Sequence, residues 1–173
     1  MTLEHRHGMT LTSAQRTLLA YIDGCATVAE VNAQPPGWAF RSTYHLLAAH
    51  GTFFAAAPRP IEMPKLTDRL CYSNAATTAA TYAAEGLLYA EGFATATVRG
   101  QQLPLAHGWC VTADGTVADP TWDFDPNAIY FGIAFQEPAV WPHDGGGLLT
   151  EPDRLLPLLR DGLSAAVPTG RQH

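Results

Sequence analysis

Three residues in the middle of the chain could together carry out thiol chemistry: Cys71, His107 and Asp119. A cysteine attacks a carbonyl as its thiolate, which a neighbouring base must generate. A histidine base in turn needs a third group that fixes its tautomer and orientation. The chain order of nucleophile, base and orienting acid therefore predicts a Cys–His–Asp triad that attacks an amide or ester carbonyl and forms a thioester intermediate.

The run that begins at Cys71 is rich in alanine and ends at Gly86. Alanine is the best helix former and lets other elements approach closely, so we predict a central helix that Gly86 ends. At a helix start, free N–H groups and the helix dipole lower the pKa of a thiol and can bind an oxyanion. A lone cysteine is more often a small buried apolar residue, but the polar Tyr72 and Asn74 that follow favour a reactive role.

A predicted hairpin decides whether His107 and Asp119 can meet, because side chains alternate between the faces of a sheet. A two-residue loop at the Asp-Gly pair 114–115 would place Cys110 opposite Asp119 and turn that carboxylate away from His107. A three-residue loop at 113–115, with its glycine in a left-handed bulge, puts the two side chains on one face. The dipeptide alone favours the shorter loop, but we predict the longer one because the triad requires it.

The remaining segments predict an α+β fold. We expect helices at 12–23 (ended by Gly24), from 27 to about 34, at 39–50 and from 150 onwards, the last kinked or broken at Pro157. Strands are expected at 52–57, 87–98, 107–113, 116–121 and 129–135, with a turn at 99–104. The chain then divides into a helical lobe (1–60), a catalytic core (61–136) and a C-terminal loop, helix and tail (137–173), which together make one compact domain. Residues 1–9 and the tail from 164 are expected to be loose.

Composition narrows the classes of partner. The 173 residues are 47% apolar and 15% charged, which is typical of a globular chain, and the net charge is −6. An acidic chain repels phosphate backbones and anionic membranes, so we expect neither nucleic acid nor membrane as a partner. The early helices are faintly similar to a helix-turn-helix, but they lack its basic surface. Without an export signal or an apolar run of about 18 residues, we expect a cytoplasmic protein with three reduced cysteines.

Two short motifs carry a resemblance to a known family. His107-Gly108-Trp109 and Asp119-Pro-Thr-Trp122 follow Cys71 in an order that resembles the transglutaminase-like branch of the papain-like cysteine enzymes. The match covers roughly residues 65–135, and the family usually has alanine where this chain has Gly108. The resemblance implies a papain-like core, in which a cysteine-bearing helix packs on an antiparallel sheet. It also implies a thiol peptidase or amidase, or a transglutaminase-like acyl transferase.

The resemblance also implies roles for individual residues. Cys71 is the nucleophile, His107 the base and later the acid, and Asp119 the orienting group. Trp109 is expected to pack beside the site and exclude water, with Tyr72 and Trp122 also lining it. The oxyanion hole would combine the Cys71 N–H group with a side chain, for which the candidates are Tyr44, His45 and Gln101.

Two alternatives remain open. A catalytically silent binding module could keep the same fold, and a zinc ion could bind Cys71 and His107. Their spacing does not resemble the short paired motifs of structural zinc sites, so we expect no metal ion and no cofactor. The expected partner is a peptide, protein or small amide substrate. Cys25 and Cys110 are expected to be structural.

Overall fold

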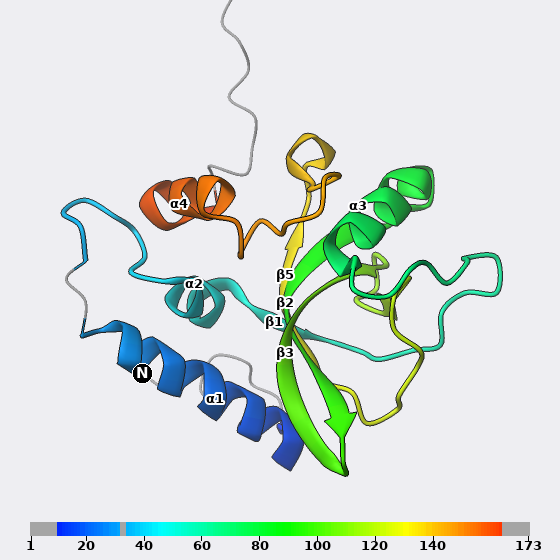
Figure 1. The fold of residues 1–173 in the computed structure, drawn as a ribbon, viewed down its shortest axis with the longest axis horizontal. Helices are drawn as coiled ribbons and strands as arrows, with labels where there is room; N and C mark the ends of the chain where they lie inside the picture. The colour runs from blue at the N-terminus through cyan, green and yellow to red at the C-terminus, as the bar shows by residue number, and fades with distance from the viewer. Residues whose placement is uncertain (1–9, 32–33, 164–173) are drawn as a thin grey trace, which may run out of the picture.

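The computed structural model describes residues 10–31 and 34–163. These residues form a mixed α+β fold, as predicted, with a curled antiparallel sheet and helices around it (Figure 1). The helices are α1 Ser13–Ala29, α2 Thr43–His50, α3 Cys71–Thr81 and α4 Pro152–Asp161, with 3-10 turns at Ala83–Glu85 and Pro138–Val140. The strands are β1 Thr52–Phe54, β2 Leu88–Val98, β3 Gln101–Val111, β4 Val117–Ala118 and β5 Tyr130–Phe135. The loose ends predicted at 1–9 and from 164 lie outside the described residues.

The sheet has the order β1-β5-β2-β3-β4, and all neighbouring strands are antiparallel. Its two edges meet, because Ala55 after β1 bridges to Thr116 before β4. The Ala55 N–H donates to the Gly115 carbonyl (3.1 Å), and the Val117 N–H donates to the Ala55 carbonyl (2.8 Å). The sheet therefore has an inner face that packs on itself and an outer face that the helices cover.

Each face has its own core. The inner core contains seven buried residues: Ala90, Ala94, Trp109, Val111, Val117, Ala128 and Tyr130. The outer core is larger and joins the sheet to residues of all four helices. Cys110 belongs to this outer core, where its thiol donates to the Ala75 carbonyl of α3 at 3.2 Å. Because side chains alternate along β3, His107 and Trp109 lie on the inner face.

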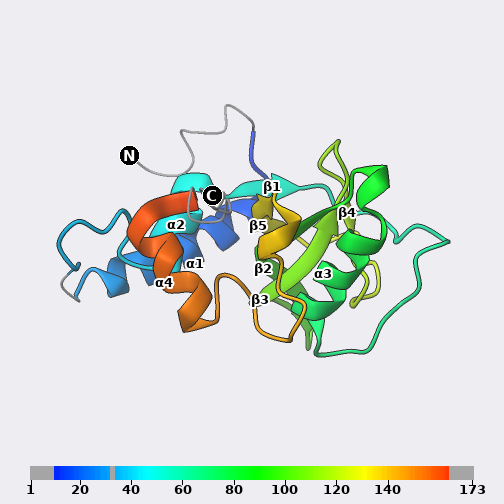
Figure 2. The same cartoon turned by 90° about the horizontal axis from the view of Figure 1, so that it is seen from above.

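The helices lie in two groups. α3 packs on the outer side of β2 and β3, whereas α1, α2 and α4 gather at the other end of the sheet (Figures 1 and 2). Two backbone hydrogen bonds tie the C-terminal helix to the segment before α2: Ala39 N–H to the Arg160 carbonyl (3.0 Å) and Phe40 N–H to the Leu159 carbonyl (2.8 Å). None of the described helices has the length and apolarity needed to cross a bilayer.

The first helix is longer than predicted. The capping box of Thr12 and Gln15 is confirmed, with hydrogen bonds of 2.9 and 3.2 Å. The helix then continues through Gly24 to Ala29, so the two helices expected here are one. Gly24 keeps a helical backbone and does not adopt the positive φ of a helix stop. The Thr27 hydroxyl donates to the carbonyl of Asp23 (2.9 Å) and does not cap a new helix.

Several other boundaries also differ from the prediction. The strands expected at 52–57 and 116–121 are shorter, and α3 ends at Thr81, so that a 3-10 turn separates it from Gly86. α2 begins at Thr43, not at 39, because the Ser42 side chain caps it. β3 begins at Gln101, which shortens the expected turn to Arg99 and Gly100, both at positive φ. A proline at 104 is tolerated inside β3 because the short β4 does not cover that part of its edge. α4 continues through Pro157 to Asp161, held by the buried Leu158 and Leu159 that follow the proline.

Candidate active site

Cys71 is the first residue of α3, as the alanine-rich run predicts. The first hydrogen bond of this helix joins the Asn74 N–H to the Leu70 carbonyl at 2.8 Å. Leu70 occupies the cap position and supplies no side-chain hydrogen bond. The N–H groups of the first turn are therefore uncapped at the half-buried thiol, which is an arrangement suited to binding an anion.

The hairpin between β3 and β4 has the predicted three-residue loop. Cys110 lies opposite Ala118 and Val111 opposite Val117, so the next pair is Thr112 with Thr116, joined by a 2.9 Å backbone hydrogen bond. Gly115 has the expected left-handed conformation, with φ of 82°. This register brings Asp119 to the same face as His107.

His107 and Asp119 form a buried pair. The imidazole Nε2 lies 2.8 Å from Asp119 Oδ2, and both side chains are almost completely shielded from solvent. Since Nε2 is taken by Asp119, Nδ1 is the ring nitrogen that remains for the thiol. The carboxylate also accepts three further hydrogen bonds: from the Tyr130 hydroxyl (3.0 Å), Thr121 N–H (2.8 Å) and Trp122 N–H (3.0 Å).

His107 and Asp119 each shift the pKa of the other. Burial alone would raise the pKa of Asp119, but the hydrogen bond and charge of His107, with backbone N–H groups, hold it below its usual value. Burial alone would lower the pKa of His107, but Asp119 and the neighbouring Cys71 raise it to about 8. The site therefore stabilises a protonated imidazole next to a carboxylate, which is the state that a thiolate partner needs.

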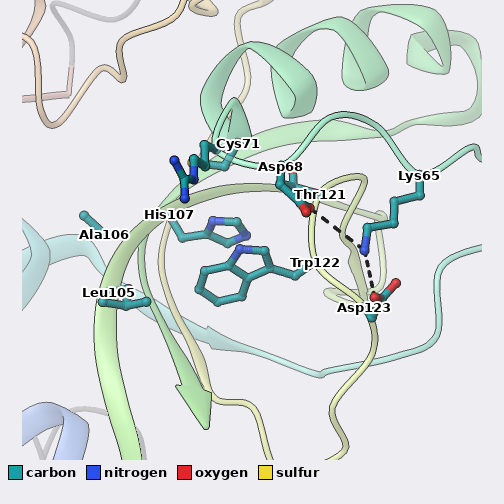
Figure 3. A pocket seen from close by; sticks show the side chains of 10 residues that line it. Lys65, Asp68, Cys71, Leu105, Ala106, His107, Thr121, Trp122 and Asp123 are labelled. Carbon is teal, nitrogen blue, oxygen red and sulfur yellow. Dashed lines mark hydrogen bonds and ion pairs between the residues drawn. The ribbon is translucent and has the colours of Figure 1, made fainter. Parts of the chain in front are cut away.

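An open cavity of about 570 Å³ leads to this pair. Cys71, His107 and Trp122 line it, whereas Asp119 lies behind the imidazole. Figure 3 shows Cys71 at the start of its helix, close to the imidazole, with the Trp122 indole against that ring. The two rings are stacked, with centroids 3.8 Å apart and planes 15° from parallel. Trp122 therefore shields one face of the imidazole from water.

Two of the residues expected to line the site are not among those lining the cavity. Trp109 is completely buried in the inner core, with its ring centroid 6.2 Å from that of His107. Tyr72 packs against Gly108, where an added Cβ would lie 2.9 Å from the tyrosine ring. Trp109 therefore packs behind His107 in the inner core and does not line the cavity. The glycine at 108 allows the start of α3 to approach β3 closely.

None of the three side chains considered for the oxyanion hole lines the cavity. Tyr44 stacks on Phe93 in the outer core at a centroid distance of 5.9 Å. His45 is held by the Ser42 hydroxyl at 2.8 Å. Gln101 lies at the far end of β3, six residues from His107. The uncapped N–H groups at the start of α3 are donors that lie beside the thiol.

The sequence did not predict the contacts of several residues that shape the site. Asn74 is buried and donates to the Thr67 carbonyl (2.7 Å) and the Thr121 hydroxyl (3.0 Å), which ties α3 to the segment after Asp119. A polar residue within an alanine-rich helix was the available signal for this role. The other unforeseen lining residues are Lys65, Asp68, Arg69, Leu105, Ala106, Thr121 and Asp123.

No cluster of three or more potential metal ligands occurs among the residues that the structure describes. Comparisons of the chain with protein-family models, with curated proteins and with solved structures find no significant match.

Proposed function

We propose that this protein is a thiol peptidase or amidase, or a related acyl transferase, with a transglutaminase-like, papain-like core. The proposal rests mainly on one observation: the buried 2.8 Å pair of His107 and Asp119 opens onto the cavity that Cys71 also lines. A buried, correctly oriented histidine beside a cysteine at a helix start is the arrangement that nucleophilic thiol catalysis needs.

The first half of the reaction forms a thioester. His107 takes the thiol proton at Nδ1, and the Cys71 sulfur attacks the carbonyl carbon of the substrate. Negative charge develops on the carbonyl oxygen, where N–H groups of the first turn of α3 can donate to it. The imidazolium then gives its proton to the departing amine or alcohol, and the carbon–nitrogen or carbon–oxygen bond breaks.

The second half releases the acyl group. His107 takes a proton from water or from an acceptor amine, which attacks the thioester carbonyl. The carbon–sulfur bond breaks, and the proton returns to the Cys71 sulfur. Asp119 keeps the imidazole in the required tautomer throughout and stabilises its protonated form.

Acylation by p-nitrophenyl acetate tests this proposal directly. We expect a burst of one nitrophenolate per protein molecule, with an acetyl group on Cys71 detected by mass spectrometry. Cys71→Ala should abolish the burst, and Cys25→Ser is the matched control that should keep it. If the wild type releases nitrophenolate no faster than Cys71→Ala, the protein is not a thiol enzyme and the binding-module alternative is favoured.

A further inference from the structure

Of the two cations that line the cavity, Lys65 forms ion pairs and Arg69 forms none with the residues that the structure describes. Lys65 lies 2.7 Å from Asp123 and 3.9 Å from Asp68, so carboxylates within the cavity wall already neutralise it (Figure 3). Arg69 also lines the cavity and is exposed. Within the described part of the chain, its guanidinium has no recorded hydrogen bond or ion pair. It is therefore a cation available to a ligand, two residues before the nucleophile.

The backbone of Arg69 gives a second, independent reason to assign it a role. Its φ is 70°, in the left-handed region that glycine adopts easily and that residues with a Cβ seldom adopt. Such outliers occur preferentially at functional sites, where the surrounding structure compensates for their cost. Arg99 shares this feature in the β2–β3 turn, but only Arg69 combines it with a place in the cavity wall, two residues before Cys71.

The cavity wall also has an apolar part. Leu105 is 42% exposed although it is a large aliphatic residue, and it lines the cavity next to Ala106. Figure 3 shows these two residues on the side of the cavity away from Lys65 and Asp123. A ligand that satisfies both features has an apolar segment and an anionic group.

We propose that the site selects acyl substrates that carry a carboxylate near the scissile bond, bound by Arg69, with an apolar segment against Leu105. This inference rests on the proposed function and names its substrate class. The guanidinium binds a carboxylate through paired N–H donors, which also fixes its orientation. The carboxylate can belong to the acyl group or to the free C-terminus of a peptide, and the test separates these sources.

Two pairs of probes differ only in the carboxylate. Mono-p-nitrophenyl adipate is compared with its uncharged methyl ester, and acetyl-trileucine is compared with its C-terminal amide. Each probe is titrated into the Cys71→Ala variant by calorimetry, so the measurement does not depend on turnover. We expect the carboxylate form of one pair to bind about 10- to 100-fold more tightly, as one charge-assisted contact implies, and the pair that responds identifies the source.

Arg69→Gly in the Cys71→Ala background should remove this preference without lowering Tm, because glycine tolerates the backbone conformation. Arg99→Gly is the matched control, since Arg99 is also an arginine at positive φ (51°) but lies in the β2–β3 turn outside the cavity lining. It should keep the preference. Equal binding of acid and neutral forms in both pairs, or a preference that survives Arg69→Gly, would overturn the inference. A missing acetylation burst, by contrast, would count against the thiol enzyme alone.

Discussion

Two buried carboxylates lie on opposite faces of the sheet. They accept hydrogen bonds from the same kinds of group. Asp119 is 5% exposed on the inner side, and Glu91 is 1% exposed on the outer side. Each accepts two backbone N–H groups and one tyrosine hydroxyl. For Glu91 these donors are Leu148 N–H (2.6 Å), Leu149 N–H (2.9 Å) and Tyr89 Oη (2.6 Å). Only Asp119 also contacts a histidine.

The pKa values of the two carboxylates shift in opposite directions. Burial raises the pKa of Glu91 to about 7, although its three donors and the charge of Arg154 oppose the change. The pKa of Asp119 is lowered despite burial, with His107 as the main cause. The hydrogen-bond donors of Glu91 and the charge of Arg154 therefore do not compensate for its burial, whereas the hydrogen bond and charge of His107, with the backbone N–H groups, do so for Asp119. Glu91 holds the loop at 148–149 to the sheet, and Asp119 can serve a proton-transfer reaction.

The largest expected effect comes from Asp119→Asn. An amide cannot stabilise the imidazolium, so kcat/KM for p-nitrophenyl acetate should fall about 10³- to 10⁴-fold. The alkaline limb of the pH profile, set by the His107 pKa of about 8, should move to lower pH because the neighbouring charge is lost. The same exchange at the other carboxylate, Glu91→Gln, should leave the activity within about twofold. Comparable losses from both variants would refute the division of roles.

Glu91→Ala should have the largest effect on stability. It leaves two backbone N–H groups and the Tyr89 hydroxyl buried without their acceptor, which costs about 3 kcal/mol or more. The free energy of unfolding, from urea denaturation followed by circular dichroism, measures this loss. A change below about 0.5 kcal/mol would mean that the loop at 148–149 does not depend on the carboxylate.

The pH dependence of stability offers a sharper comparison. The pKa of Glu91 is raised in the folded state to about 7. Its contribution to the free energy of unfolding is therefore fully present below the pKa of the unfolded state and is lost as pH rises through about 7. Wild type should therefore lose up to about 3 kcal/mol relative to Glu91→Gln between pH 4.5 and 7.5. Parallel curves of unfolding free energy for the two proteins would show that Glu91 does not titrate in this range.

The smallest effects are expected from the two tyrosine hydroxyls. Tyr130→Phe and Tyr89→Phe each remove one donor to a buried carboxylate and should cost about 0.5–1.5 kcal/mol of stability. Only Tyr130→Phe should also slow the esterase burst, by less than about tenfold, because only its partner orients His107. Stopped-flow measurement of both variants checks this, and a slower burst in Tyr89→Phe would contradict it.

The sequence allowed the inner carboxylate to be predicted but not the outer one. Asp119 follows a short hairpin, so its face depends on a loop of three residues whose length the proposed chemistry selected. Glu91 depends on N–H groups 57 and 58 residues further along the chain, and no local pattern predicts that contact. Local patterns were also insufficient at Gly24 and Pro157. Each residue predicts a helix end or kink, but packing keeps both helices continuous.

The most direct test of the central claim, that the His107–Asp119 pair activates Cys71, is the alkylation rate of each cysteine by iodoacetamide between pH 5 and 9. Mass spectrometry distinguishes Cys71 from Cys25 and from Cys110, whose thiol is buried and has a raised pKa. We predict that Cys71 reacts at pH 6 faster than a free model thiol, that Asp119→Asn removes this advantage, and that Glu91→Gln keeps it. A Cys71 that reacts no faster than the model thiol, or equally fast after Asp119→Asn, would contradict the claim.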